Sequence, residues 1–290
     1  MGQLVQIEQF WSSNPCGSWS GKSEEGIKYF NEVEEYRYKT IKHIPVVARF
    51  NEFANKKVLE VGCGLGTDGK QFAKNGAIYT GINLDEGSTI LAKENFSLFN
   101  LKGEISQMNA EKLKFDDKTF DHVYSCGVIH HTESPEKIFR EILRVLKPGG
   151  TIRIMLYNKS SINYHFEIMF LRKIFRYLLI PSFSPKVISK LTGFDRKKLE
   201  RHRSILLSEK MTKEKWISIN TDGPDCPMAR VYTKKDVMKI FSETGFKEIK
   251  TYVRFFDKSH YSFLGKLIPD SVAERIGKWA GWSRWIEAVA

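Results

Sequence analysis

The chain lacks several patterns that would assign a protein to a class at once. It has only four cysteines in 290 residues, none in a C-x-x-C pair, so we expect neither a zinc site nor a disulfide framework, but reduced thiols and a cytoplasmic location. No run of about 18 apolar residues occurs, so no membrane-spanning helix is expected. The opening residues, MGQLVQIEQFW, have neither the basic nor the apolar segment of a signal peptide. Internal repeats and low-complexity tracts are also missing.

Positive charge is abundant and unevenly distributed. The chain has a net charge of +12, yet residues 1–56 carry seven Lys/Arg and seven Asp/Glu. Residues 158–230 carry fifteen Lys/Arg against seven Asp/Glu, an excess of +8. Such a block can bind nucleic acid, a membrane surface or an anionic substrate, or it can be a solvated surface.

Apolar runs and helical patterns alternate along the middle of the chain. Helices are expected at 67–76, 86–100 and 134–150, the last with a Pro-Gly-Gly stop. This alternation predicts an α/β fold with a doubly wound, mostly parallel sheet covered on both faces. The expected strands are residues 57–61, 77–84, 103–109, 119–127, 151–158 and 284–290, and residues 233–253 are expected to add a further helix and strand.

Two regions lie outside this alternation. Residues 1–56 precede the first strand, and the helical pattern of residues 26–50 within them predicts an N-terminal helical lid. Residues 158–230 are too long for a simple loop, which predicts an inserted, basic and mainly helical cap. The core would then be residues 57–157, completed by residues 231–290.

The stretch KKVLEVGCGLGTDG, residues 56–69, places four glycines behind the first strand. It is not a P-loop, because Gly69 is followed by Lys-Gln rather than Lys-Ser/Thr. It is not the dinucleotide pattern G-x-G-x-x-G either, because Thr67 stands at the last glycine position. The pattern present is E-x-G-x-G-x-G, from Glu60 to Gly66.

Four further stretches follow in order: GINLDE, MNAEKLKF, KTFDHVYSCGVIHHT and ILRVLKPGGTIRI. With the glycine stretch, they resemble the motifs of the class I S-adenosylmethionine (SAM) dependent methyltransferases over residues 57–157. The resemblance implies a Rossmann-like, seven-stranded sheet, SAM as cofactor, S-adenosylhomocysteine as product, and no metal.

The resemblance also implies the cofactor contacts. Glycines let the backbone approach the cofactor closely, and Glu60 would hold its ammonium group or else cap the following helix. Asn83 and Asn109 stand where the family usually has acids, and an amide can still accept hydrogen bonds there. The expected cofactor-binding residues are Glu60, Gly62, Cys63, Gly64, Gly66, Asn83, Leu84, Asn109, Ala110 and Cys126, with Tyr29 and Arg37 from the lid.

Catalytic candidates follow the fourth and fifth strands. His131, and secondarily His130, could act as a general base, although a His-His pair follows this strand in many such enzymes whatever their acceptor. Tyr157 could donate a hydrogen bond to the acceptor or only pack beside it. In the loop NTDGPDCPMARVYT, Asp222 and Asp225 could meet a polar or cationic group.

The cap segment YHFEIMFLRKIFRYLLIPSFSP, residues 164–185, is apolar except on one side, where Arg172, Lys173 and Arg176 are expected to lie together. It could contact a membrane surface or a lipid-like acceptor, form a homo-oligomer contact, or be the cap's own core.

The leading hypothesis is a SAM-dependent methyltransferase acting on a small-molecule acceptor in an enclosed pocket. An RNA methyltransferase that grips phosphates with the basic insertion is the alternative, and a non-catalytic SAM-binding scaffold is the third. No DNA partner is expected.

Overall fold

The computed structural model describes residues 2–24, 26–256, 258, 265 and 267–290. The chain divides into two compact units. The first comprises Met1–Leu156, Lys234–Tyr252 and Trp285–Ala290, and the second comprises Tyr157–Thr233 and Val253–Arg284. The four functional segments expected from the sequence remain a prediction.

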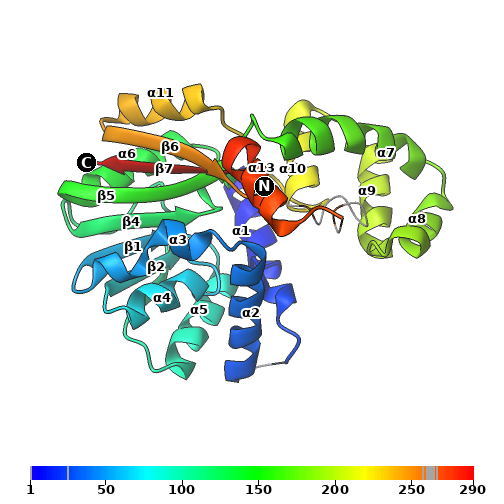
Figure 1. Cartoon of the computed structure of the whole chain (residues 1–290). Coiled ribbons are helices and arrows are strands. Elements are labelled where there is room, and N and C mark those ends of the chain that lie inside the picture. Colours follow the sequence, from blue (N-terminus) through cyan, green and yellow to red (C-terminus); the bar gives the residue numbers. More distant parts are fainter. Residues whose placement is uncertain (1, 25, 257, 259–264, 266) are drawn as a thin grey trace. The chain divides into compact units, whose positions relative to one another are not determined.

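The first unit is built on a seven-stranded sheet with helices on both faces (Figure 1). Its strand order is β3-β2-β1-β4-β5-β7-β6. The pairs β1–β2, β1–β4, β2–β3 and β4–β5 are parallel. The bounds are β1 (Lys57–Val61), β2 (Ile78–Asn83), β3 (Glu104–Gln107), β4 (Phe120–Cys126), β5 (Leu146–Tyr157), β6 (Lys247–Arg254) and β7 (Ser283–Val289).

Strand β7 runs against β5. The amide of Ala290 donates to the carbonyl of Gly150 at 2.9 Å, and the amide of Asn158 donates to that of Trp282 at 2.8 Å. Opposite ends of the two strands are therefore neighbours, which is the antiparallel arrangement. The mostly parallel, doubly wound Rossmann-like sheet predicted from the sequence is confirmed.

Central strands are buried on both faces, as expected for a sheet covered by helices. Val58, Leu59, Val123 and Ile154 are each 0% exposed.

The helical elements of this unit are α1 (Gln3–Ser13), η1 (Ser18–Ser20), α2 (Gly26–Thr40), α3 (Ile44–Ala48), η2 (Phe50–Phe53), α4 (Thr67–Lys74), α5 (Glu86–Leu98), η3 (Ile129–His131), α6 (Pro135–Val145) and α11 (Lys234–Thr244).

Three local expectations differ from the structure. Helix α1 lies ahead of residues 26–50, to which the sequence assigned the helical pattern of the lid, and it was not predicted. The helical pattern after residue 26 is broken between α2 and α3, where Pro45 occupies the first turn of α3 and restricts the residue before it. The expected Pro-Gly-Gly loop at 148–150 lies inside β5, which begins directly after α6; Gly149 takes a left-handed φ of 76° there.

The second unit is helical among its described residues. Its elements pack through side-chain bonds to backbone carbonyls: the indole of Trp216 donates to Ile168 at 2.9 Å, and the guanidinium of Arg203 to Ile180 at 2.8 Å. Its elements are the π-helix η4 (Asn163–Leu171), then α7 (Arg172–Leu179), α8 (Ser184–Thr192), α9 (Arg196–Ser208), α10 (Lys213–Thr221) and α13 (Asp270–Ala280). Among the helices described, none combines the length and the hydrophobicity needed to cross a bilayer.

Candidate active site

A cavity of about 260 Å³ lies within the first unit, at the carboxyl ends of β1, β2 and β4. This is where ligands bind in open parallel sheets. The loops after these strands line one side, and α1, η1 and α2 line the other. Of the residues predicted from the sequence, the cavity is lined by Arg37, Glu60, Gly62, Cys63, Gly64, Asn83, Leu84, Asn109, Ala110, Cys126 and His131.

Three predicted residues of this unit do not line the cavity. Gly66 is the N-cap of α4, with a φ of 75°. The hydroxyl of Tyr29 donates to the carbonyl of Ser18 at 2.9 Å, and its ring packs on the core around Phe30. His130 is 0% exposed, and burial together with His131 lowers its pKa well below the usual range. The cavity therefore favours His131 over His130 as the candidate base.

The glycine loop leaves open space next to the cavity. Gly62 and Gly64 have left-handed φ values of 75° and 52°, a conformation that is costly for other residues. A Cβ on Gly62 would meet Val128 Cγ2 at 2.4 Å, whereas a Cβ on Gly64 would have no protein atom within 4 Å. A side chain at Gly64 would therefore occupy space that a ligand can use.

Gly69, the fourth glycine of the stretch, has a structural role that the sequence did not indicate. A Cβ on Gly69 would lie 2.2 Å from the hydroxyl oxygen of Tyr79. That hydroxyl donates to Glu60 Oε2 at 2.6 Å. Gly69 thus makes room for the tyrosine that positions Glu60. The structure does not support the capping interpretation of Glu60, because Gly66 caps α4 without a side-chain bond.

Burial shapes the acid–base properties of the cavity. Glu60 is 3% exposed, and burial, followed by the negative charge of Asp68, raises its pKa. Burial likewise raises the pKa of Cys126 to about 12, so this thiol stays protonated and is not a nucleophile. A cationic group in the cavity would stabilise the charged form of Glu60.

Asn83 closes the glycine loop with both ends of its amide. Its Oδ1 accepts from the Gly64 amide at 2.8 Å, and its Nδ2 donates to the Gly64 carbonyl at 3.0 Å. An aspartate could make only the first of these bonds, because an ionised carboxylate has no donor. The departure from the usual acid therefore has a structural reason, and the ribose contact of Asn83 remains a prediction.

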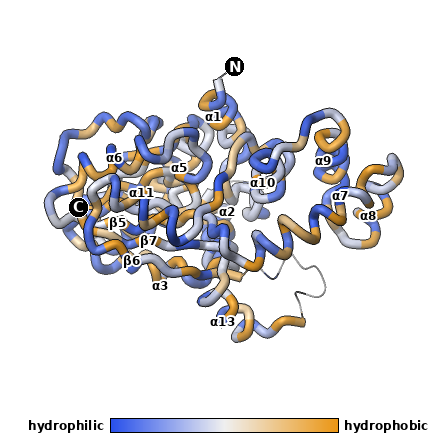
Figure 2. Tube along the Cα trace, turned by 90° about the horizontal axis from the view of Figure 1, so that it is seen from above, coloured by the Kyte–Doolittle hydropathy of each residue, from blue (hydrophilic) through white to orange (hydrophobic). Residues whose placement is uncertain are grey.

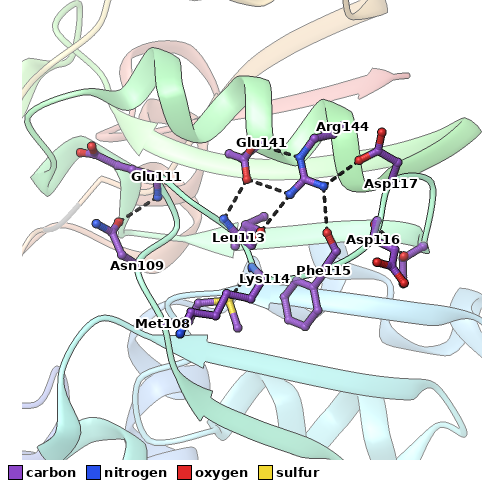
Figure 3. A network of polar contacts seen from close by, with 11 residues as sticks. Met108, Asn109, Glu111, Leu113, Lys114, Phe115, Asp116, Asp117, Glu141 and Arg144 are labelled. Carbon is purple, nitrogen blue, oxygen red and sulfur yellow. Dashed lines mark hydrogen bonds and ion pairs between the residues drawn. The ribbon is translucent and has the colours of Figure 1, made fainter.

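The loop after β3, which carries Asn109 and Ala110, is held in place by hydrogen bonds from two side chains of helix α6 (Figure 3). The guanidinium of Arg144 donates to the carbonyls of Leu113 at 2.9 Å and Phe115 at 2.8 Å. Glu141 accepts from Arg144 and also from the Leu113 amide at 2.8 Å. The planar fork of arginine suits this multiple bonding.

Aromatic side chains from the N-terminal elements complete the cavity. Trp11 of α1 meets the ring of His131 edge-on, with centroids 5.0 Å apart. Trp19 and Tyr36 also line the cavity, and their rings lie 5.0 Å apart. The sequence predicted an N-terminal lid, but it did not single out these three residues.

The remaining predicted residues belong to the second unit. The hydroxyl of Tyr157 donates to Asp222 Oδ1 at 2.9 Å. Asp225 pairs with Arg201 at 2.6 Å. The roles suggested for these residues toward an acceptor remain predictions.

Known proteins resemble the central part of the chain. Residues 59–154 match the model of a methyltransferase domain. Over this stretch the chain is similar to a methyltransferase domain, as the class I SAM-dependent motifs indicated. The resemblance inferred from the sequence motifs is thereby confirmed.

Individual relatives match over limited lengths. The ubiquinone biosynthesis O-methyltransferase of Pseudomonas fluorescens is 32% identical over 117 residues, which is 40% of this chain and 50% of that protein. The sterol 24-C-methyltransferase of Saccharomyces cerevisiae is 33% identical over 100 residues, or 33% of this chain and 26% of that protein. The chain thus spans about half or less of the length of these relatives.

A solved structure shows the same fold over nearly the whole chain. The magnesium protoporphyrin IX methyltransferase of Synechocystis, determined with bound S-adenosylhomocysteine, has a TM-score of 0.54. It is 13% identical, and the match covers 99% of each chain. At this identity the likeness concerns the fold.

Proposed function

We propose that this protein transfers a methyl group from SAM to a small-molecule acceptor held in the cavity of the first unit. The observation that carries the proposal is the cavity itself, in which a methyltransferase-type glycine loop faces an aromatic wall supplied by α1, η1 and α2. Bound SAM supplies an electrophilic methyl group on a sulfonium. The protein's residues then have to bind the acceptor, orient it toward this methyl group and exclude water from the cavity.

The residues present fit this cofactor. Glu60 is a buried carboxylate at the cavity wall and would pair with the ammonium group of the cofactor's methionine part. Gly62 and Gly64 would let the backbone approach the cofactor, and Asn109 and Ala110 would lie on its adenine side. The relatives named as a ubiquinone biosynthesis O-methyltransferase and a sterol 24-C-methyltransferase support a small organic acceptor.

Acceptor binding would fall to the aromatic wall. Trp11, Trp19 and Tyr36 give an apolar surface with polar edges, which suits a planar or lipid-like acceptor better than a highly charged one. His131 would accept a proton from the acceptor where methylation requires it. The oxygen, nitrogen, sulfur or carbon nature of the accepting atom is set by the acceptor and not by the fold.

Cofactor binding is tested by calorimetry with SAM and S-adenosylhomocysteine on the wild type and on Gly64→Leu. We expect binding to be lost in the variant, because its side chain fills cofactor space. Gly149→Leu is the matched control, since Gly149 also has a left-handed φ, 76°, and no atom within 4 Å of an added Cβ. Equal binding by both variants would place the cofactor elsewhere.

Acceptor class is tested with radiolabelled SAM in a cell extract that is fractionated afterwards. Label in small molecules or lipids supports the proposal. Label in RNA would contradict it.

A further inference from the structure

The helices from η4 to α9 expose an unusually apolar surface. In the part of the chain that the structure describes, 22 large hydrophobic side chains are exposed, and 12 of them lie between residues 166 and 207. Phe183 and Leu191 are 66% and 79% exposed. Figure 2 shows the hydrophobic and hydrophilic positions alternating along α7, α8 and α9. We call the exposed apolar side chains of residues 166–194 the cap surface.

Helix α7 is inverted relative to an ordinary amphipathic helix. At 100° per residue, Arg172, Arg176 and Leu179 share one side, and Ile174 and Leu178 lie on the opposite side. Arg172 faces the interior of the unit, where it pairs with the buried Glu167 at 2.6 Å, while Ile174 and Leu178 are about half exposed. Lys173 lies within 100° of Arg172 and Arg176 around the helix, but it is exposed whereas the two arginines are half-buried, so the three cations share a side without being equally open to solvent.

The interpretation of this segment as the cap's own core therefore holds for only part of it. Ile168 and Leu179 are buried at 3% and 7% exposure, together with Ile205 at 1%, whereas Ile174 and Leu178 lie outside that core. Phe166 and Phe170 stack on each other with centroids 5.8 Å apart, yet both remain about half exposed. An apolar surface of this extent indicates an interaction site.

Positive charge surrounds the cap surface. Residues 163–208 contain ten Lys/Arg and three Asp/Glu, a net charge of +7 in 46 residues. Three of the arginines are paired with Glu167, Glu200 or Asp225. Lysines on the same helices are exposed, and they form no ion pair with the residues the structure describes: Lys173, Lys186, Lys190, Lys197 and Lys198.

We propose that the cap surface binds the interface of a membrane that contains anionic lipids. An exposed apolar face bordered by lysines inserts its side chains among acyl chains and places its charges at the phosphates. The proposal goes beyond methyl transfer and does not depend on it.

Two other occupants suit the surface less well. In a symmetric dimer the cap surface of one copy would pack against that of the other. The two regions, each with a net charge of +7, would then repel one another. An RNA would satisfy the lysines and could stack on exposed phenylalanines, but it would leave aliphatic side chains such as Ile174, Leu178 and Val187 in contact with water. An anionic bilayer satisfies both the apolar and the charged residues.

The test is sedimentation of the full chain with vesicles of phosphatidylcholine alone, or of equal parts phosphatidylcholine and phosphatidylglycerol. We expect binding to the mixed vesicles only. Ile174→Ser/Leu178→Ser should weaken it by roughly tenfold or more, because two inserted side chains are lost. Lys186→Glu/Lys190→Glu should weaken it comparably and reduce its salt dependence.

Matched controls come from the first unit. Val46→Ser/Ile78→Ser removes two side chains that are 74% and 55% exposed, and Lys93→Glu/Lys102→Glu reverses two exposed charges. Both should bind vesicles like the wild type, and circular dichroism should show all four variants folded. Equal loss in cap variants and controls, or equal binding to both vesicle types, would overturn the proposal. So would a wild-type dimer that Ile174→Ser/Leu178→Ser dissociates, or RNA binding in place of vesicle binding.

Discussion

Arg37 and Asp68 form a bidentate ion pair that joins the N-terminal helix α2 to the first turn of α4. Arg37 Nε lies 2.8 Å from Asp68 Oδ1, and Nη2 lies 2.5 Å from Oδ2. The hydroxyls of Tyr38 and Tyr124 donate to the same carboxylate at 3.0 and 2.9 Å. The helix that closes the cavity is thus fastened to the element that follows the glycine loop.

Asp68→Asn should therefore destabilise the protein. The Asp68 side chain is 1% exposed and that of Arg37 is 24% exposed, so the variant leaves the guanidinium poorly compensated. We expect a loss of about 3 kcal/mol in the free energy of unfolding, measured by urea denaturation. Glu243→Gln, which removes the exposed ion pair of Lys239, is the control and should change stability by less than about 0.5 kcal/mol. If Asp68→Asn lowered the free energy of unfolding by no more than this control, water would be compensating Arg37 in place of Asp68.

Glu60→Gln should change the pH dependence of the protein's stability. Burial, followed by the charge of Asp68, raises the pKa of Glu60 from 4.5 to about 8. The folded state then holds this proton more tightly than the unfolded state, so the contribution of Glu60 to stability is present at low pH and is lost as pH rises toward 8. Glutamine does not titrate, and the melting temperature of the variant should fall less with pH between about pH 4.5 and pH 8.

The same variant should bind SAM more weakly. A charge-assisted hydrogen bond contributes roughly 1.5–3 kcal/mol, so the dissociation constant should rise about tenfold or more. Wild-type affinity should increase with pH as Glu60 ionises, and the variant should lose this dependence. Glu104→Gln, on the exposed edge of β3, is the control. Unchanged affinity in Glu60→Gln would remove Glu60 from the cofactor site.

Arg144→Lys should loosen the loop after β3 while keeping the charge of α6. A lysine cannot donate to both the Leu113 and the Phe115 carbonyl in the fixed geometry of a guanidinium. We expect stability to fall by about 1–2 kcal/mol and SAM to bind a few-fold more weakly, measured by denaturation and calorimetry. Arg140→Lys, an exposed position on the same helix, should change neither. An affinity as high as that of the wild type would show that Asn109 and Ala110 hold their places without Arg144.

The parts of the site that could be predicted are those encoded by neighbouring residues. The glycine loop follows β1, Asn83 ends β2 and Asn109 lies two residues after β3. In a parallel sheet these strand ends meet at one edge. The structure brings these residues together around one cavity, as the motifs indicated.

The unpredicted parts depend on contacts between distant segments. Arg37 and Asp68 are 31 residues apart, and Trp11 meets His131 across 120 residues. The pattern of neighbouring residues in the sequence does not predict contacts between residues this far apart. The sequence left open which side of α7 faces outward for a related reason: periodicity identifies the two sides of a helix, but only the buried Glu167 decides that Arg172 turns inward.

His131→Ala should lower the rate of methyl transfer by about 10²-fold if His131 accepts the acceptor's proton. The histidine lines the cavity and lies against Trp11, so removal of its ring also leaves space beside the indole. His131→Gln is therefore the more discriminating variant, because it keeps much of the volume and cannot serve as a base. Both should bind SAM like the wild type in calorimetry, and His165→Ala, an exposed position in the second unit, should react normally. If His131→Gln retains the full rate while His131→Ala does not, the histidine supports Trp11 and the acceptor wall, and the proton leaves by another route.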